Sequence, residues 1–311
     1  MSVLIDLLVS TAFFASAVRL AVPLILAGVG EVISERAGVI NIGLEGMMLM
    51  GAFTGVVGSD LTGNPWLGAL AAALGGMAVA GIHGFVVITW AGNQIVSGLA
   101  LNLGSLGLTT YLSRQIWDTG QQQEVAHFEP LHVPGLSDIP FFGRVLFQQT
   151  AFFYFAVVVA IVLAFILFRS RTGLAWRASG ENPAALDSVG VSVPATRWKA
   201  LLVCGALAGI GGGAISLAQL FTFIENMTGG RGFIVLALVI VTRWHPMWAI
   251  GVALFFGATD AVALRVQALN ITAIPYQFSL MLPFVLTLVF YGFAARRGHP
   301  PASLGRPWMK S

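Results

Sequence analysis

The chain has 311 residues, of which 57% are hydrophobic and only 9% are charged, and its formal net charge is +3. A soluble domain typically carries about 25% charged residues, so this chain lacks the polar shell that a large apolar core needs in water. The small, scattered net charge excludes an extended nucleic-acid-binding surface, and the single cysteine, Cys204, excludes an internal disulfide framework.

Apolar runs of membrane-spanning length recur along the chain. A helix needs about 20 apolar residues to cross the hydrocarbon core of a bilayer. Helices are expected because the runs are too long and continuous for barrel strands. The sequence therefore predicts an all-α transmembrane helical bundle of about eight to ten spans, with residues 1–311 forming a single transmembrane domain. The predicted spans lie near 9–30, 39–58, 66–90, 93–112, 151–169, 199–222, 232–250, 249–268 and 275–293.

The two longest connections differ in charge. Residues 113–150 are net acidic, and residues 169–199 are rich in arginine. Basic residues near span ends favour the cytoplasm. We therefore predict that 113–150 is an external loop and that 169–199 is a cytoplasmic loop. The basic C-terminal tail is expected on the cytoplasmic side as well, and nine spans would place the N-terminus outside.

The densest polar motif covers residues 30–52, in which Asn41 and Glu45 are four residues apart and are expected to share a helix face. An ionisable side chain within a span is costly and normally faces the bundle interior or water. One interpretation is an element of a translocation path. The alternative is a packing seam in which Glu45 caps a neighbouring helix.

Two glycine-containing helix starts, at residues 38–43 and 229–234, resemble each other. Transporters often contain structural repeats with broken, Gly-rich helices at matching positions. An internal repeat is one interpretation, and chance similarity is the other.

The arginine-rich loop contains a short helix signal. Asn182 is a candidate N-cap, Pro183 occupies the first helical position, and Gly190 is a candidate stop after the helix. A short helix there is suited to docking on a cytoplasmic partner, and the alternative is a helix resting on lipid head groups. The aromatic residues Phe221 and Phe223 are either stacking partners for a planar solute or interfacial anchors.

Several catalytic motifs are absent from the sequence. The chain has two lysines, Lys199 and Lys310, and neither follows a glycine, so no phosphate-binding Gly-x-x-x-x-Gly-Lys loop is present. Metal-binding Cys/His clusters and a Gly-x-Ser-x-Gly motif are also missing. We therefore expect a chain that is not an enzyme and binds no cofactor, ATP included.

Residues 35–52 resemble the signature of permease subunits of bacterial ATP-binding cassette (ABC) importers for nucleosides and simple sugars. This superfamily includes the ribose and branched-chain amino acid permeases. Residues 230–246 resemble its second-half motif. The polar loop is similar to its cytoplasmic coupling segment, and the residues that carry this similarity are Gly180, Glu181, Asn182, Pro183, Ala184, Ala185 and Gly190.

The resemblance implies a type II-like importer permease in the bacterial inner membrane. A second permease subunit, identical or related, would complete the pore, and two cytoplasmic ABC ATPases would bind the ATP. An external solute-binding lipoprotein or periplasmic protein would deliver a nucleoside or related ribose-containing solute. The candidate path residues are Asn41, Glu45, Phe221 and Phe223. The alternatives are a simple-sugar importer and an ion-coupled secondary carrier, for which Glu45 and Asp260 would be the coupling carboxylates.

Overall fold

A computed structural model describes residues 10–117, 124–268 and 299–309, together with the single positions 281, 285, 286, 288, 289 and 292. The regular elements within these ranges are helices, and no strand occurs among them, which confirms the predicted all-α fold. The predicted span 275–293 lies mostly outside the described residues.

Six helical segments in the described part of the chain are long and apolar enough to cross a bilayer. The segments based on α4 and α9 each end in a short π-helical turn, η1 (Phe85–Thr89) and η3 (Ser216–Leu220). The six spanning helices are α2 (Thr11–Arg36), α4 (Pro65–Gly84), α5 (Gln94–Ile116), α6 (Ala151–Arg169), α9 (Val193–Ile215) and α11 (Pro246–Ala268).

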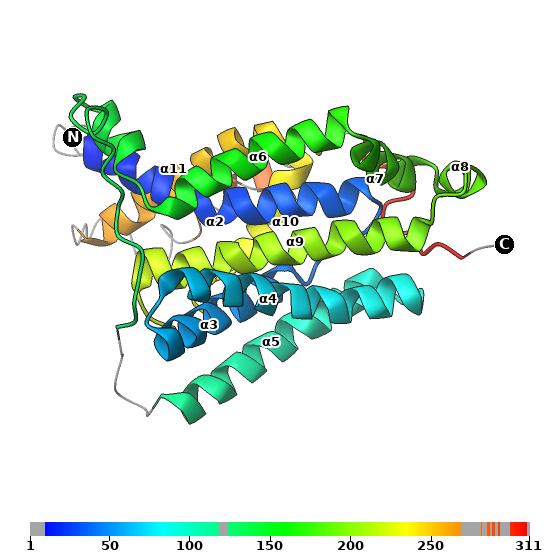
Figure 1. The fold of residues 1–311 in the computed structure, drawn as a ribbon, viewed down its shortest axis with the longest axis horizontal. Coiled ribbons are helices and arrows are strands. Elements are labelled where there is room, and N and C mark those ends of the chain that lie inside the picture. The colour runs from blue at the N-terminus through cyan, green and yellow to red at the C-terminus, as the bar shows by residue number, and fades with distance from the viewer. Residues whose placement is uncertain are drawn as a thin grey trace.

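Helices α2 and α9 form the centre of the bundle (Figure 1). Their most apolar windows are 72% and 78% buried, whereas that of α5 is 22% buried. α2 packs against α9 and α11, and α9 also packs against α4 and α3 (Leu44–Thr62). Glycine permits the closest of these approaches, because a Cβ atom at Gly212 of α9 would overlap the backbone of Met48 in α3.

Two helices begin inside the bundle after an irregular segment. Residues 37–43 lead into α3, and residues 221–230 lead into α10 (Arg231–Val241). The predicted span 39–58 starts too early, because Gly38 has a φ of +95° and α3 begins only at Leu44. Both halves of the proposed repeat therefore precede a helix with a buried start, and the repeat itself stays a prediction.

The predicted span 232–250 is wrong. α10 has 11 residues and is therefore only about 16 Å long, which is too short for the hydrocarbon core. It ends at Val241, residues 242–245 form a turn, and α11 starts at Pro246. The chain cannot remain helical through this turn because Arg243 and Trp244 adopt positive φ values of 53° and 56°.

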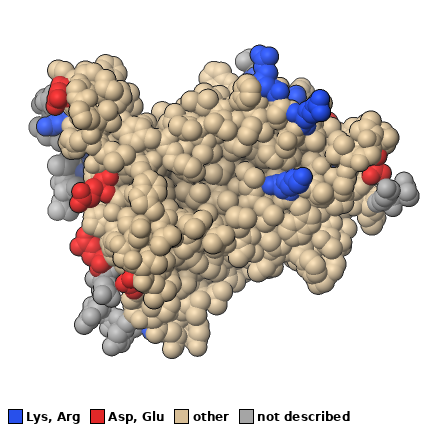
Figure 2. All heavy atoms as spheres, viewed as in Figure 1, with Lys and Arg blue, Asp and Glu red and all other residues tan. Residues whose placement is uncertain are grey.

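The two ends of the bundle differ in composition. Residues 124–150, with the short π-helical segment η2 (Gly143–Phe147), lie at one end, which we call the 124–150 end. α7 (Arg171–Glu181) and α8 (Pro183–Ser188) lie at the opposite end together with residues 299–309, and we call this the α7–α8 end. On the face drawn in Figure 2, most acidic side chains gather at the 124–150 end, and basic side chains lie towards the α7–α8 end.

Candidate transport site

Glu45 joins the starts of the two internal helices. It lies in the first turn of α3, and its carboxylate accepts hydrogen bonds from Thr228 Oγ1 at 2.5 Å, Gly230 N at 2.8 Å and Gly232 N at 2.6 Å. Backbone N–H groups at a helix start lack intrahelical acceptors and favour a nearby negative charge. This geometry is that of the capping alternative. A solute that bound Glu45 would have to share the carboxylate with these three donors, and the role of Glu45 in the path stays a prediction.

Asn41 belongs to a second buried polar cluster. Its backbone N–H donates to Glu31 Oε1 at 3.0 Å, and its Nδ2 atom lies 3.2 Å from Met47 Sδ and 3.4 Å from Cys204 Sγ. The Cys204 thiol donates to Glu31 Oε2 at 3.2 Å. The prediction that Asn41 and Glu45 share a helix face is wrong, because Asn41 precedes α3 and is not helical.

The side-chain oxygen of Asn41 is unusual within this cluster. It is buried and has no hydrogen-bond partner among the described residues. An unsatisfied buried acceptor is costly in an apolar interior. The Oδ1 atom of Asn41 is therefore an acceptor whose hydrogen-bonding capacity the described residues leave unused.

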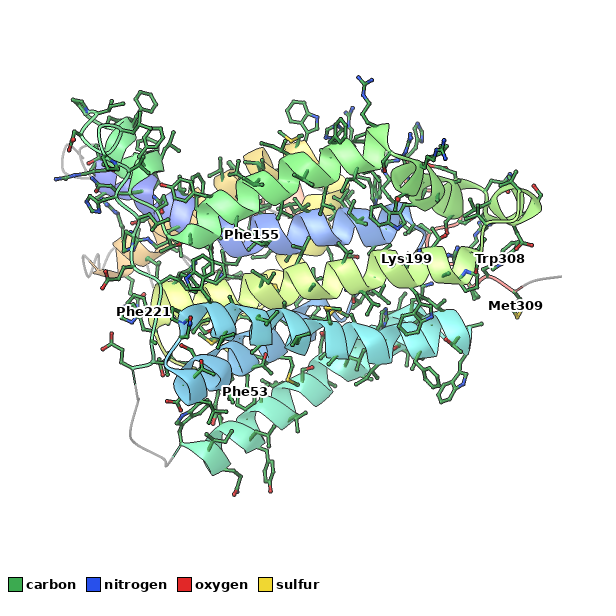
Figure 3. All side chains as sticks on the ribbon, viewed as in Figure 1. Phe53, Phe155, Lys199, Phe221, Trp308 and Met309 are labelled. Carbon is green, nitrogen blue, oxygen red and sulfur yellow. The ribbon has the colours of Figure 1, made fainter. Side chains whose placement is uncertain are left out.

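Phe221 lies at the 124–150 end (Figure 3), where its carbonyl accepts a hydrogen bond from Val125 N at 3.1 Å. Phe223 follows it in the irregular segment 221–230. The Phe221 ring packs on His127 with centroids 4.2 Å apart. The Phe223 ring packs edge-on against Phe53 at 5.3 Å and lies 6.5 Å from Trp117 at an interplanar angle of 29°. The four predicted path residues therefore occupy separate sets of contacts, and their role in a path stays a prediction.

Polar groups surround the aromatic residues at this end. The Trp117 indole donates to Asp60 Oδ2 at 3.1 Å. Arg114 donates to both carboxylate oxygens of Glu225, at 2.8 and 3.1 Å. These hydrogen bonds lower the pKa of the exposed Glu225 side chain. The 124–150 end therefore combines aromatic faces with carboxylates.

The predicted caps of the coupling segment are confirmed. Asn182 Oδ1 accepts a hydrogen bond from Ala185 N at 3.1 Å, and Pro183 is the first residue of α8. Gly190, with a φ of +82°, follows the C-cap residue Val189. Ala184 and Ala185 are exposed where α8 projects from the end of the bundle (Figure 1).

The start of the coupling segment is bound tightly to the bundle. Gly180 is buried, and a Cβ atom there would overlap the carbonyl of Arg36 at the end of α2. The Gly180 carbonyl also accepts a hydrogen bond from Ser303 N at 2.8 Å. The segment thus has a fixed end against α2 and an exposed end on α8.

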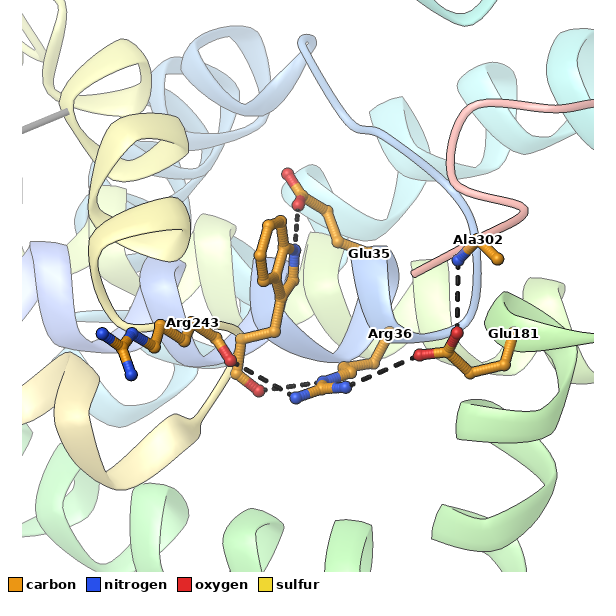
Figure 4. A network of polar contacts seen from close by, with 6 residues as sticks. Glu35, Arg36, Glu181, Arg243 and Ala302 are labelled. Atoms are coloured by element: carbon orange, nitrogen blue, oxygen red, sulfur yellow. Dashed lines mark hydrogen bonds and ion pairs between the residues drawn. The ribbon is translucent and has the colours of Figure 1, made fainter. Parts of the chain in front are cut away.

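Arg36 and Glu35 form a network that the sequence interpretation missed (Figure 4). Arg36 Nε donates to the Trp244 carbonyl at 3.0 Å, and Nη2 donates to the Arg243 carbonyl at 3.3 Å. Arg36 Nη1 lies 4.0 Å from Glu181 Oε1, and the Trp244 indole donates to Glu35 Oε2 at 2.5 Å. In the sequence, these residues could have been found as a charged Glu-Arg pair at the end of a long apolar run.

A second missed residue, Arg197, fixes the tail at the α7–α8 end. Its side chain is buried within α9, where Nη1 donates to the Arg306 carbonyl at 2.8 Å and Nε donates to Ser179 Oγ at 3.4 Å. Gly305 N donates to the Gly38 carbonyl at 3.2 Å. The tail therefore lies against both α7 and the segment that precedes α3. It occupies the same end as residues 169–199, as predicted.

Comparisons with known proteins identify the family. Residues 13–291 match the family described as "Branched-chain amino acid transport system / permease component". The chain is 38% identical over 303 residues to the guanosine ABC transporter permease NupQ of Bacillus subtilis, with 93% of this chain and 94% of that protein covered. It is 36% identical over 297 residues to the nucleoside ABC transporter permease NupC of Lactococcus lactis, with the same shares covered.

A sugar permease and one solved structure complete the comparison. A candidate glucose ABC transporter permease of Haloferax volcanii, TsgC13, is 40% identical over 262 residues, which cover 83% of this chain and 78% of that protein. The structure of PsaBC from Streptococcus pneumoniae in complex with Fab shares the fold, with a TM-score of 0.50, 14% identity, and 96% and 97% of the two chains covered. The chain therefore belongs to the branched-chain amino acid transport system permease family and is a multi-pass ABC transporter permease.

Proposed function

We propose that the chain is a permease subunit of an ATP-driven importer of nucleosides or related ribose-containing solutes in the bacterial inner membrane. The observation that carries this proposal is the end-to-end similarity to permeases named for guanosine and nucleosides, at 38% and 36% identity over 94% of each relative. The candidate glucose permease is similar over 78% of its length, so a monosaccharide is the second candidate.

The partners follow from the proposed function. A second permease subunit completes the pore, two cytoplasmic ABC ATPases bind the ATP, and an external solute-binding protein delivers the solute. This chain then has no ATPase activity of its own. The exposed Ala184 and Ala185 on α8 support docking of an ATPase at the α7–α8 end. That end faces the cytoplasm in this proposal, and the 124–150 end faces outward.

The proposed path starts at the 124–150 end. The near-parallel rings of Phe223 and Trp117 offer faces on which a planar base can stack, and the adjacent Asp60 is an acceptor for hydroxyl groups. Phe221 lies at the same end of the bundle. Asn41 and Glu45 supply polar groups deeper in the bundle, where Asn41 Oδ1, which has no partner in the described part of the chain, can accept a hydrogen bond.

Reconstitution in proteoliposomes tests the proposal. The complex contains this chain with a second permease subunit, two ABC ATPases and a solute-binding protein. Uptake of labelled guanosine, ribose and glucose is compared with and without ATP. We expect guanosine uptake that requires ATP and is inhibited neither by an ionophore nor by unlabelled glucose. Uptake of glucose alone would favour the sugar importer. Gradient-driven uptake by this chain without any ATPase would establish the secondary carrier instead.

A further inference from the structure

The turn between α10 and α11 has a strained backbone. Arg243 and Trp244 are consecutive non-glycine residues with φ values of 53° and 56°. Residues other than glycine rarely adopt this left-handed backbone conformation, and it persists where surrounding contacts hold the backbone in place. Local hydrogen bonds close the turn, from Arg243 N to the Ile240 carbonyl and from Trp244 N to the Val239 carbonyl, at 3.1 Å each, and contacts from other elements add to these bonds.

Those external contacts come from the last two residues of α2. The Arg36 guanidinium donates to the carbonyls of both strained residues, at 3.0 Å from Nε to Trp244 and 3.3 Å from Nη2 to Arg243. The Trp244 indole is fixed by Glu35. A planar guanidinium presents several donors in a rigid fork, so one side chain can hold two adjacent carbonyls.

Arg36 also contacts the coupling segment. Its Nη1 atom lies 4.0 Å from Glu181 Oε1, with the two side chains 21% and 53% exposed. An ion pair this exposed contributes little alone. The close approach of Gly180 to the Arg36 carbonyl supplies the firmer contact, because backbone meets backbone there. Movement of residues 180–181 would therefore displace Arg36 directly.

α10 connects this turn to the middle of the bundle. Its 11 residues form a rod about 16 Å long. One end of the rod meets the strained turn held by Arg36. The other end, at Gly230 and Gly232, is held by the Glu45 carboxylate. A shift of the turn would therefore alter the contact between α10 and α3.

We infer that Arg36 is the positioning residue that passes movement of the coupling segment to the α10–α11 turn, and through α10 to the junction on Glu45. This inference rests on the proposed function, because it takes residues 180–185 to be the docking site of the ATPase. Arg36 touches neither solute nor ATP in this scheme. Its substitution should separate ATP hydrolysis from uptake.

The test uses the assembled complex in proteoliposomes and measures guanosine uptake and ATP hydrolysis in parallel. Arg36→Gln retains a polar side chain but loses the guanidinium fork. We expect uptake per ATP hydrolysed to fall about tenfold, while stimulated hydrolysis stays within about twofold of wild type. Glu181→Gln should reduce the ratio less, and it should have no further effect in the Arg36→Gln background, because both act on one connection.

Controls separate this inference from a structural defect and from failure of the proposed function. Arg169→Gln changes an exposed arginine at the same end, and it should leave the ratio unchanged. Co-elution of the subunits and the thermal unfolding temperature are measured for each variant. Normal coupling in Arg36→Gln, or equal loss of uptake, hydrolysis and assembly, would overturn the inference. If the wild-type complex shows no ATP-dependent guanosine uptake, the proposed function has failed instead.

Discussion

The Glu45 carboxylate lies between the first turns of two helices, and its surroundings explain how a charge is tolerated there. An unpaired carboxylate in an apolar interior is strongly disfavoured. Three donors from residues 228–232 offset this cost, and two of them are backbone N–H groups at the start of α10. The charge stabilises both helix starts because each presents the positive end of its dipole.

Glu45→Gln should destabilise the protein more than it impairs solute recognition. A glutamine has one acceptor oxygen for three donors, and its amide N–H₂ would face another N–H group. We expect a loss of about 1–3 kcal/mol in the free energy of unfolding, visible as a lower unfolding temperature in detergent. Glu225→Gln, at a carboxylate with an exposed side chain, is the matched control. Loss of uptake at an unchanged unfolding temperature would instead favour a direct role in the path.

Residue-scale features differ in how well sequence predicts them. The caps at Asn182 and Gly190 were predictable because a cap depends on neighbours within a few residues. The partners of Asn41 were not, because Cys204 is 163 residues away in the sequence and its approach depends on how α9 packs. Asn41 and Glu45 are polar residues in an apolar run, but their i, i+4 spacing does not place them on one helix face because α3 begins only at Leu44.

At the scale of elements, hydropathy located the long helices and failed at the interrupted ones. The run 232–250 is apolar enough for a span, and hydropathy carries no information about φ angles. The local signal was Pro246, which begins α11 and disfavours helix in the preceding residue. The buried starts of α3 and α10 follow from contacts between distant segments, so sequence alone did not give their depth.

Gly180→Ala should loosen the docking of α7 on α2. A Cβ atom at Gly180 would overlap the Arg36 carbonyl, so the coupling segment would have to shift away from the bundle. We expect at least about a tenfold loss of guanosine uptake while membrane insertion stays normal, because the spans are untouched. Quantitative immunoblotting of membranes provides the insertion measurement.

Gly81→Ala is the matched control for this change. Gly81 lies in α4, and a Cβ atom there meets nothing within 4 Å. The control should transport at the wild-type rate. Wild-type uptake by Gly180→Ala would show that the close contact between residues 180 and 36 is dispensable.

At the scale of the whole molecule, the sequence predicted the bundle but not its internal order. The most apolar windows of α2 and α9 are 72% and 78% buried, and that of α5 is 22% buried, yet all three are apolar. In a membrane, side chains that face lipid are as apolar as those that face the core. Hydropathy therefore cannot distinguish a central helix from a peripheral one. Glycines that permit close packing, such as Gly209 and Gly212 of α9, are the stronger signal for a central position.

Charge asymmetry gives the whole-molecule prediction, which concerns the orientation in the membrane. Arginines concentrate in residues 169–199, and residues 113–150 are net acidic. The positive-inside tendency then places the α7–α8 end in the cytoplasm. The native Cys204 is buried, so single cysteines introduced on the surface can be labelled selectively. Glu129 and Val189 are exposed at opposite ends of the bundle and are suitable positions.

We expect Glu129→Cys to react with a membrane-impermeant maleimide in intact cells, and Val189→Cys to react only after the membrane is permeabilised. The parent chain with Cys204 alone should stay unlabelled in both conditions, because its thiol is buried among α2 and α9 side chains. The opposite labelling pattern would place α8 outside, where no cytoplasmic ATPase can reach it. That result would reject both the proposed coupling segment and the Arg36 connection, since each requires residues 180–185 to face the cytoplasm.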